Sequence, residues 1–273
     1  MTSFQTLRTD VSHRVATIWL NRPERRNAFS SVMTRELYEA FALFESAEDV
    51  RAIVVTGTGR YFSAGADLER GGQTFNRPAD AAPAATDPAG RIEPVLMRTP
   101  VIAAMNGSAV GMGLTLPLGW DIRFAAADAK YGFVFTRRGI VPEASSTWLL
   151  PRLIGVSRAM ELLLSGRIFS GTEAAEMGLV SRALAAADVL PAAQEFACDL
   201  ADNTSAVSVA ATKALVYGAL EHGRGAAHER EREVFRWMGR QADAAEGVTA
   251  FLEKRAPQWP LSKVKDYPPM LSE

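Results

Sequence analysis

The sequence predicts an α/β fold, because short apolar runs alternate with helical patterns in the first two-thirds and helical patterns dominate the last third. The chain has 273 residues, and nearly half of them (48%) are hydrophobic. This length suits one large α/β domain or a domain with a helical extension. We therefore expect a strand-rich core followed by a helical module.

The first elements are predicted to form a strand–helix–strand unit. Residues 15–20 are apolar and β-branched, which favours a strand. Ser30 or Ser31 can cap a following helix, and residues 52–56 predict a second buried strand. Apolar side chains recur at helical spacing between the two strands at Met33, Leu37, Phe41 and Phe44. The crossover is expected to be right-handed and the two strands parallel.

The middle of the chain predicts a loop and two further strands. Residues 71–90 are rich in Ala, Pro and Gly, which indicates a mobile loop or a poorly ordered helix. Residues 100–105 and 121–126 read as strands, with a buried helix expected over 107–119. The uncharged stretch 99–120 is long enough to span a bilayer, but its glycines and prolines favour a buried strand–loop–helix.

From about Ser146 onward the pattern is helical. The helices expected there cover residues 172–177, 207–217, 226–239 and 245–255.

Charge and cysteine content exclude several classes of protein. The net charge is −1, from 30 basic and 31 acidic residues, so we expect no nucleic-acid partner and no membrane partner. The single cysteine, Cys198, cannot form an internal disulfide and suits a reducing compartment. Residues 1–5 lack the features of a signal peptide, so a cytoplasmic location is expected. The three histidines lack ligand spacing and support neither a metal site nor a Ser/His/Asp triad.

Glu143 is a candidate proton carrier because it is the only carboxylate between Asp128 and Glu161. It follows a Gly/Pro turn, and apolar neighbours such as Trp148 would raise its pKa and make it a usable base near neutral pH. Pro142 followed by Glu143 also looks like the first turn of a helix, where the helix dipole favours a carboxylate.

Two glycine-containing loops follow predicted strands, at residues 63–67 and 106–113. Glycine lets the backbone turn tightly and lets main-chain N–H groups approach a ligand. Two such N–H groups aimed at one thioester oxygen would form an oxyanion hole. On these residues alone, ordinary turns are the better explanation.

Several short motifs occur along the chain in one order and with suitable spacing. They are Asn-Arg-Pro at 21–23, Asn-Ala at 27–28, Phe-Ser-Ala-Gly-Ala-Asp-Leu at 62–68, Ala-Ala-Met-Asn-Gly-Ser-Ala-Val-Gly-Met-Gly at 103–113, Asp-Ile-Arg at 121–123, Gly-Ile-Val-Pro at 139–142, Leu-Pro-Arg-Leu-Ile-Gly at 150–155, Gly-Arg at 166–167 and Ala-Ala-Glu-Met-Gly-Leu-Val at 174–180. This set resembles the crotonase, or enoyl-CoA hydratase/isomerase, superfamily over about residues 4–256.

The resemblance implies an α/β fold of the crotonase-like type, a spiral of ββα units with a C-terminal helical trimerisation module. We place the core at residues 1–200 and the helical oligomerisation module at 201–273. The resemblance also implies an acyl-CoA thioester substrate and a homotrimer or a dimer of trimers. It implies no metal or redox cofactor, since coenzyme A is part of the substrate.

The resemblance also assigns candidate site residues. The two oxyanion-hole N–H groups map to Ala66 and Met112. Candidate substrate-binding residues are Arg25, Ala64, Asp67, Gly111, Phe135, Trp148 and Lys254. Three of these have a second interpretation: Asp67 can hold its loop in shape, Arg25 can belong to a solvated turn, and Lys254 can be an ordinary surface lysine instead of reaching the coenzyme A of a neighbouring subunit.

The chain departs from the family's hydratases at both of their catalytic glutamates. The matching positions hold Thr115 and Phe135, and neither side chain can act as a carboxylate base. Glu143 falls where isomerases of the family place a single acid and where dehalogenases place a nucleophile. We expect isomerase-type proton transfer by Glu143. Atypical hydration, hydrolysis or dehalogenation through Glu143, and a non-catalytic acyl-CoA-binding oligomer are the alternatives.

Overall fold

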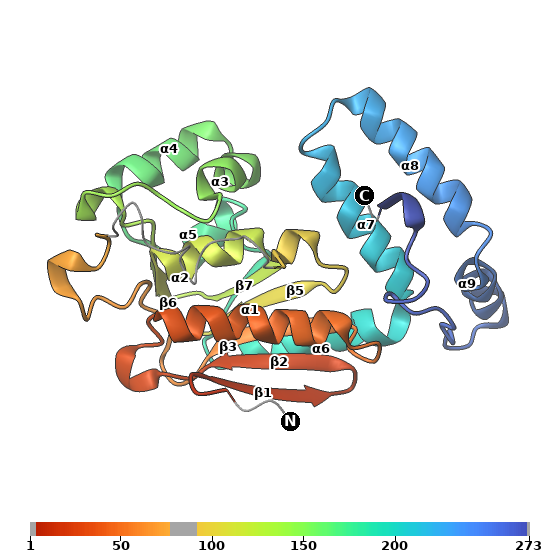
Figure 1. Cartoon of the computed structure of the whole chain (residues 1–273), viewed down its shortest axis with the longest axis horizontal. Helices are drawn as coiled ribbons and strands as arrows, with labels where there is room; N and C mark the ends of the chain where they lie inside the picture. Colours follow the sequence, from red (N-terminus) through yellow and green to blue (C-terminus); the bar gives the residue numbers. More distant parts are fainter. Residues whose placement is uncertain (1–3, 77–91, 272–273) are drawn as a thin grey trace.

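Two sheets build the core of the computed structural model, which describes residues 4–76 and 92–271 (Figure 1). The larger sheet has the order β1-β2-β3-β5-β7-β10, and the smaller one β4-β6-β8-β9. The pairs β1–β2 and β8–β9 are antiparallel, and the other pairs are parallel. The strands are β1 (Leu7–Ser12), β2 (Val15–Leu20), β3 (Ala52–Gly57), β4 (Tyr61–Ser63), β5 (Val101–Met105), β6 (Ser108–Val110), β7 (Ile122–Ala126), β8 (Lys130–Gly132), β9 (Phe169–Ser170) and β10 (Arg182–Leu184).

Helices cover the sheets and extend beyond them at the C-terminal end (Figure 1). They are α1 (Ser31–Ser46), α2 (Met112–Thr115), α3 (Ser146–Ile154), α4 (Val156–Ser165), α5 (Gly171–Glu176), α6 (Val189–Asn203), α7 (Ala206–Ala219), α8 (Arg224–Met238) and α9 (Ala242–Glu253). Short 3₁₀ turns are η1 (Pro23–Arg25), η2 (Gly71–Gln73), η3 (Pro94–Leu96), η4 (Leu116–Gly119), η5 (Thr136–Arg138) and η6 (Pro269–Leu271). No helix within the described residues is long and apolar enough to cross a membrane.

The predicted strand–helix–strand unit is confirmed. Strands β2 and β3 pair in parallel, and α1 connects them. The Ser30 hydroxyl accepts a hydrogen bond of 3.2 Å from the Met33 N–H, so Ser30 is the residue that caps α1. The four predicted apolar side chains of α1 are all buried.

The central strands of the larger sheet are buried on both faces, which explains their continuous apolar sequences. Along β3, Ile53 and Val55 pack into the cluster under α1, whereas Ala52 and Val54 pack into the cluster under α6. The period of two that sends alternate side chains to opposite faces is thus visible in a single strand. Small residues of α6 complete the second cluster at Ala193, Ala197 and Ala201.

The helix predicted over residues 107–119 is wrong in its first part. Residues 108–110 form β6, and only residues 112–119 are helical, as α2 and η4. A Cβ on Gly107 would lie 2.1 Å from the Arg60 carbonyl oxygen, so glycine permits a backbone approach that pairs β6 with β4. The sequence prediction also left out β1, β4, β9, β10 and α6.

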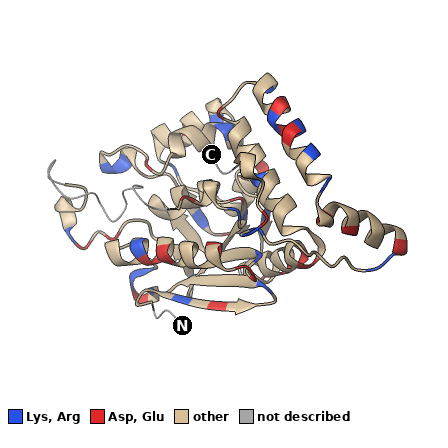
Figure 2. Cartoon of the chain, turned by 45° about the vertical axis from the view of Figure 1, so that its right-hand side comes forward, with Lys and Arg blue, Asp and Glu red and all other residues tan. Residues whose placement is uncertain are grey.

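The predicted C-terminal helices are confirmed, with ends shifted by a few residues, as α5, α7, α8 and α9. Most of the predicted loop at 71–90 lies outside the described residues. The helices α7, α8 and α9 form an arm at one end of the molecule (Figure 1), and α8 carries closely spaced charges of both signs (Figure 2). The boundary placed at residue 200 falls inside α6 and stays a prediction.

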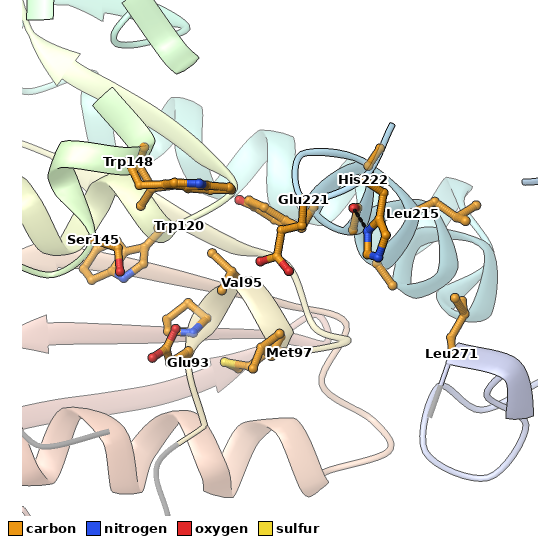
Figure 3. A pocket seen from close by; sticks show the side chains of 18 of the residues that line it. Glu93, Val95, Met97, Trp120, Ser145, Trp148, Leu215, Glu221, His222 and Leu271 are labelled. Atoms are coloured by element: carbon orange, nitrogen blue, oxygen red, sulfur yellow. Dashed lines mark hydrogen bonds between the residues drawn. The ribbon is translucent and has the colours of Figure 1, made fainter. Parts of the chain in front are cut away.

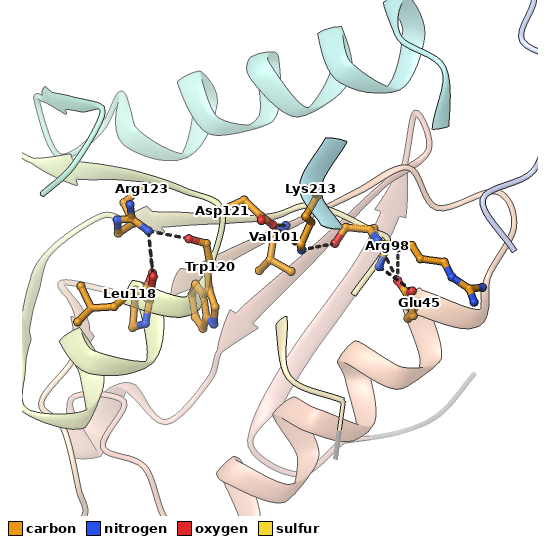
Figure 4. Close-up of polar contacts among 10 residues, drawn as sticks. Glu45, Arg98, Val101, Leu118, Trp120, Asp121, Arg123 and Lys213 are labelled. Atoms are coloured by element: carbon orange, nitrogen blue, oxygen red, sulfur yellow. Dashed lines mark hydrogen bonds and ion pairs between the residues drawn. The ribbon is translucent and has the colours of Figure 1, made fainter. Parts of the chain in front are cut away.

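A buried ion pair attaches this arm to the larger sheet (Figure 4). Lys213 of α7 donates to Asp121 Oδ2 at 2.7 Å and to the Thr99 carbonyl at 3.2 Å. The same Asp121 oxygen accepts the Val101 N–H at 2.7 Å. The side chains of Lys213 and Asp121 are only 5% and 14% exposed, so each charge depends on the other for compensation.

Replacing Lys213 with alanine should lower the free energy of unfolding by about 3–5 kcal/mol, because the substitution leaves the largely buried Asp121 carboxylate without its cation. Urea unfolding at a fixed protein concentration measures the change. Lys265→Ala is the control, since Lys265 and Glu48 form an ion pair of 2.8 Å with side chains 69% and 46% exposed. That variant should lose less than about 1 kcal/mol. Equal losses in the two variants would contradict the prediction.

Candidate active site

The two glycine loops meet beyond the ends of β4 and β6. These strands are parallel neighbours, with Tyr61 opposite Ser108 and Ser63 opposite Ala109. Gly65 has φ +86°, and a Cβ built on it would lie 2.6 Å from the Val110 carbonyl oxygen and 3.5 Å from the Met112 nitrogen. The first loop therefore touches the second just where α2 begins.

Each loop presents a main-chain N–H without an acceptor among the described residues, at Ala66 and at Met112. Their neighbours are bonded: Asp67 N–H donates to the Phe29 carbonyl at 2.9 Å, and Gly111 N–H to the Gly132 carbonyl at 3.0 Å. Met112 is the first residue of α2, where an N–H has no partner within the helix. Two free donors thus lie on two loops in contact.

Asp67 fixes the shape of the first loop. Its carboxylate pairs with Arg22 at 2.9 Å, and both side chains are mostly buried. The other carboxylate oxygen accepts the Glu69 N–H at 3.1 Å. Arg22 also donates to the Ala28 carbonyl at 2.7 Å. These bonds hold the turn around Ala66 to the segment that precedes α1.

Glu143 and Thr115 form a further polar contact, at the last residue of α2. The Thr115 hydroxyl donates to Oε1 of Glu143. Thr115 is fully buried and follows Met112 by three residues in α2. Burial of the Glu143 carboxylate raises its pKa, and the hydrogen bond from Thr115 lowers it by less, so the pKa ends above the ordinary value. Glu143 as a whole residue keeps an exposed surface, but its carboxylate reaches inward to a buried hydroxyl, and that end decides the direction of the shift.

Glu143 does not lie in the first turn of a helix, so that interpretation is wrong. Helix α3 starts at Ser146, and Ser145 is its N-cap. Ala144 and Ser145 have φ +53° and +55°, a left-handed backbone conformation that is rare for residues other than glycine. These two residues turn the chain sharply, so that the Glu143 side chain bonds to Thr115 of α2 while its carbonyl accepts the Ser146 N–H at 3.1 Å.

A cavity of about 1070 Å³ lies between the core and the C-terminal arm, and Glu143, Thr115, Ala66 and Met112 are not among the residues that line it. Ser145 and Trp148 line it on the core side and Leu215 on the arm side (Figure 3). Leu116 and Ala144, the residues that follow Thr115 and Glu143, also line it. The Arg152 guanidinium stacks on the Trp148 ring at 3.9 Å from its centroid and holds that ring in place.

Three other predicted site residues make contacts of their own or lie elsewhere in the chain. Phe135 is 5% exposed and packs into the main hydrophobic core. Arg25 forms an exposed ion pair of 3.1 Å with Glu69. Lys254 follows α9, which lies in the arm at the other end of the molecule from α2 (Figure 1).

Ala64 and Gly111, in contrast, belong to the two loops: Ala64 N–H donates to the Arg26 carbonyl at 2.9 Å, and Gly111 caps α2. Within the described part of the chain, no group of three or more His, Cys, Asp or Glu side chains could hold a metal ion.

Sequence reasoning missed the contribution of Thr115 and of the arm. It treated Thr115 only as the loss of a glutamate, although a hydroxyl one turn after an N–H donor could have been recognised as a partner for a nearby acid. No local sequence pattern predicts the arm side of the cavity, which includes Tyr217, because this side depends on how α7 packs against the core.

Comparisons with known proteins identify the family of this chain. The family model described as enoyl-CoA hydratase/isomerase matches residues 10–261. The chain is 37% identical to a 1,2-epoxyphenylacetyl-CoA isomerase of Escherichia coli, over 91% of this chain and 96% of that protein. It is also 37% identical to an enoyl-CoA hydratase of Alternaria alternata, over 90% of this chain and 82% of that protein.

A crystal structure of a probable enoyl-CoA hydratase/isomerase from Mycobacterium abscessus superimposes with a TM-score of 0.86 at 38% identity, covering 93% of this chain and 98% of that one. This likeness confirms the crotonase-like α/β fold expected from the motifs. The chain belongs to the enoyl-CoA hydratase/isomerase, or crotonase, superfamily of enzymes, which act on acyl-CoA thioesters.

Proposed function

We propose that this protein is an enoyl-CoA isomerase that moves a carbon–carbon double bond by a 1,3-proton shift, with Glu143 as its single acid–base group. The observation that carries the proposal is the bond between Glu143 and Thr115. A hydroxyl stands where the hydratases of the family hold a second carboxylate, so one carboxylate remains beside the two loops. One carboxylate is sufficient for a proton shift.

The reaction needs three groups of this chain. The thioester oxygen accepts hydrogen bonds from the main-chain N–H groups of Ala66 and Met112, which stabilise negative charge on that oxygen. Glu143 removes a proton from C2 of a 3-enoyl thioester, and the electron pair spreads over a dienolate. Glu143 then returns the proton to C4, which leaves the double bond between C2 and C3.

The environment of Glu143 supports its use as a base. A carboxylate with a raised pKa holds a proton more readily than an exposed one and is therefore better matched to a weak carbon acid. It must be deprotonated at the start of the cycle. The rate is therefore expected to rise as the pH rises through the pKa of Glu143.

The acyl group is proposed to extend into the cavity beside Trp148. Leu116 and Ala144, which follow Thr115 and Glu143 in the sequence, line this cavity, and Trp148 adds an aromatic surface to it. The E. coli relative is named for a substrate whose acyl group carries a ring. That name and the aromatic lining together support a ring-bearing or similarly bulky acyl group. Arg25 and Lys254 remain proposals for contacts with coenzyme A.

Atypical hydration is the second candidate, and the names of several relatives favour it. Glu143 and the Thr115 hydroxyl together would have to hold the water, because Phe135 is packed in the core. Supplying a 2-enoyl-CoA tests this candidate: formation of a 3-hydroxyacyl-CoA that Glu143→Gln abolishes would support hydration. A covalent ester trapped on Glu143 would instead support the hydrolase or dehalogenase alternative.

The arm is proposed to assemble the chain into a homotrimer or a dimer of trimers. Large apolar side chains of α8 and α9 are exposed in the single chain, with Phe235 at 80% and Phe251 at 81%. Exposed apolar surface of this kind marks a site of protein association.

Glu143→Gln should lower the rate of isomerisation of a 3-enoyl-CoA by about 10²–10⁴-fold, because the amide cannot take up the proton. Binding of a saturated acyl-CoA should persist, since the oxyanion donors are main-chain groups. Stopped assays that follow the double-bond shift measure the rate. Glu195→Gln on the exposed side of α6 is the matched control and should leave the rate unchanged. Equal rates for Glu143→Gln and the wild type would overturn the assignment of the base.

Trp148→Ala should reduce kcat/KM for a 3-enoyl-CoA carrying a phenyl ring by about tenfold more than for a short, unbranched one, because only the larger group reaches the indole. Steady-state kinetics with both substrates measure the difference. Trp19→Ala is the control, since Arg8 covers Trp19 at 4.0 Å in the same way, but on β2. The same loss with both substrates would show that Trp148 does not select the acyl group.

Phe251→Glu should weaken assembly, because it places a charge in the apolar surface that we propose to be buried between subunits. Light scattering coupled to size-exclusion chromatography should give the mass of three or six chains for the wild type and a smaller mass for the variant. Val11→Glu, an exposed apolar position on β1, should keep the wild-type mass. A wild-type mass of one chain at micromolar concentration would contradict the proposed assembly.

A further inference from the structure

We propose that Thr115 is a positioning residue whose hydroxyl donates a hydrogen bond to Oε1 of Glu143 and so leaves Oε2 as the oxygen that carries the proton. The inference rests on the proposed function and adds to it. The two oxygens of the Glu143 carboxylate then have different tasks. Thr115, which stands where the hydratases of the family have a glutamate, also takes part in the reaction.

The hydrogen bonds around Thr115 fix which way its hydroxyl points. Besides Oε1 of Glu143, the Gly111 carbonyl is the other acceptor near the hydroxyl, at 3.4 Å. That carbonyl already accepts the N–H groups of Leu114 and Thr115 at 2.8 and 3.0 Å. Because it is distant and already occupied, it competes poorly, and the hydroxyl proton is directed to Glu143. Thr115 has 0% exposure, so water does not replace this donor.

The second carboxylate oxygen is in a different position. Oε2 of Glu143 accepts no hydrogen bond from a described residue. An oxygen that accepts a hydrogen bond is a weaker base than one that does not, so the proton from C2 goes to Oε2. In the protonated carboxyl group Oε1 is the carbonyl oxygen, and it still accepts the hydrogen bond from Thr115. The same bond therefore persists while the proton is taken up and while it is returned.

Helix α2 links this arrangement to the oxyanion hole. Met112 and Thr115 lie three residues apart in it, a rise of about 4.5 Å along a helix. The N–H that faces the thioester oxygen and the hydroxyl that holds the base are thus parts of one rigid turn. A carboxyl group that cannot rotate keeps the proton on the face of the dienolate until it reaches C4.

Charged groups on the neighbouring segments are engaged elsewhere. Asp67 pairs with Arg22, Arg137 donates to the Ser165 carbonyl, and Arg152 donates to the Trp148 carbonyl and stacks on its ring. Burial and the Thr115 bond are the two causes of the shifted pKa of Glu143. Removing the hydroxyl should therefore act directly on that pKa.

Thr115→Val keeps the shape of the side chain but removes the donor, and Thr115→Ser keeps the donor. Because the bond lowers the pKa of Glu143, its loss should move the pKa further up. The rising limb of the kcat/KM pH profile should then lie at higher pH in Thr115→Val and at the wild-type position in Thr115→Ser.

We expect kcat of Thr115→Val to fall by about 10- to 100-fold, because the carboxyl group is no longer held in place. A substrate deuterated at C2 should lose more label to solvent.

The pKa of Glu143 can also be measured without substrate, by infrared titration of its carboxyl band, identified by its absence in Glu143→Gln. A higher pKa in Thr115→Val but not in Thr115→Ser supports the inference even if no 3-enoyl-CoA is isomerised, in which case only the proposed function fails. Unchanged titration and unchanged label retention in Thr115→Val would overturn the inference. Thr115→Ala serves as the hydroxyl-free variant where circular dichroism shows that Thr115→Val does not fold.

Discussion

The close backbone approach between the loops after β4 and β6 is the constraint on which the site depends. A Cβ on Gly113 would lie 2.7 Å from the Ser63 Cβ, and one on Gly65 would lie 2.6 Å from the Val110 carbonyl oxygen. Glycine at these positions lets two main chains touch without side chains between them. The approach sets the distance between the Ala66 and Met112 N–H groups. It also fixes the start of α2, and α2 in turn carries Thr115 to Glu143.

A second constraint acts on the other side of the cavity. The arm supplies one wall of the space proposed for the acyl group, and the buried pair of Lys213 and Asp121 attaches that arm to the larger sheet. Asp121 also accepts the Val101 N–H at the start of β5, the strand that leads to the second glycine loop. One carboxylate therefore connects the wall of the cavity to the strand that leads to the loop with the free Met112 N–H.

The sequence predicted those elements that leave a long apolar pattern. Strands β2, β3, β5 and β7 and helix α1 are long or deeply buried, so their composition indicates them clearly. The three-residue strand β6 is too short to show a period, and the glycine that permits its pairing looks like a helix start. Strand β1 gave a weaker signal, because only Leu7 of its six residues is buried and four are exposed.

The site was predicted in part. The loop residues and Glu143 were located by motif, because motifs fix positions along the chain. The bond between Thr115 and Glu143 joins residues 28 positions apart and depends on the left-handed turn at Ala144 and Ser145, which neither residue type indicates. The cavity depends on the docking of α7, a tertiary contact without a local pattern.

The turn at Ala144 and Ser145 has a consequence for how the enzyme selects among substrates. Both residues line the cavity, and both hold Glu143 in place through an uncommon backbone conformation that costs about 1 kcal/mol or more per residue. With the acyl group in this cavity, as proposed, a group that fits badly would press on the same two residues that position the Glu143 carboxylate. Poor fit would then lower the turnover rate as well as the affinity, and an ill-shaped thioester could bind without being transformed.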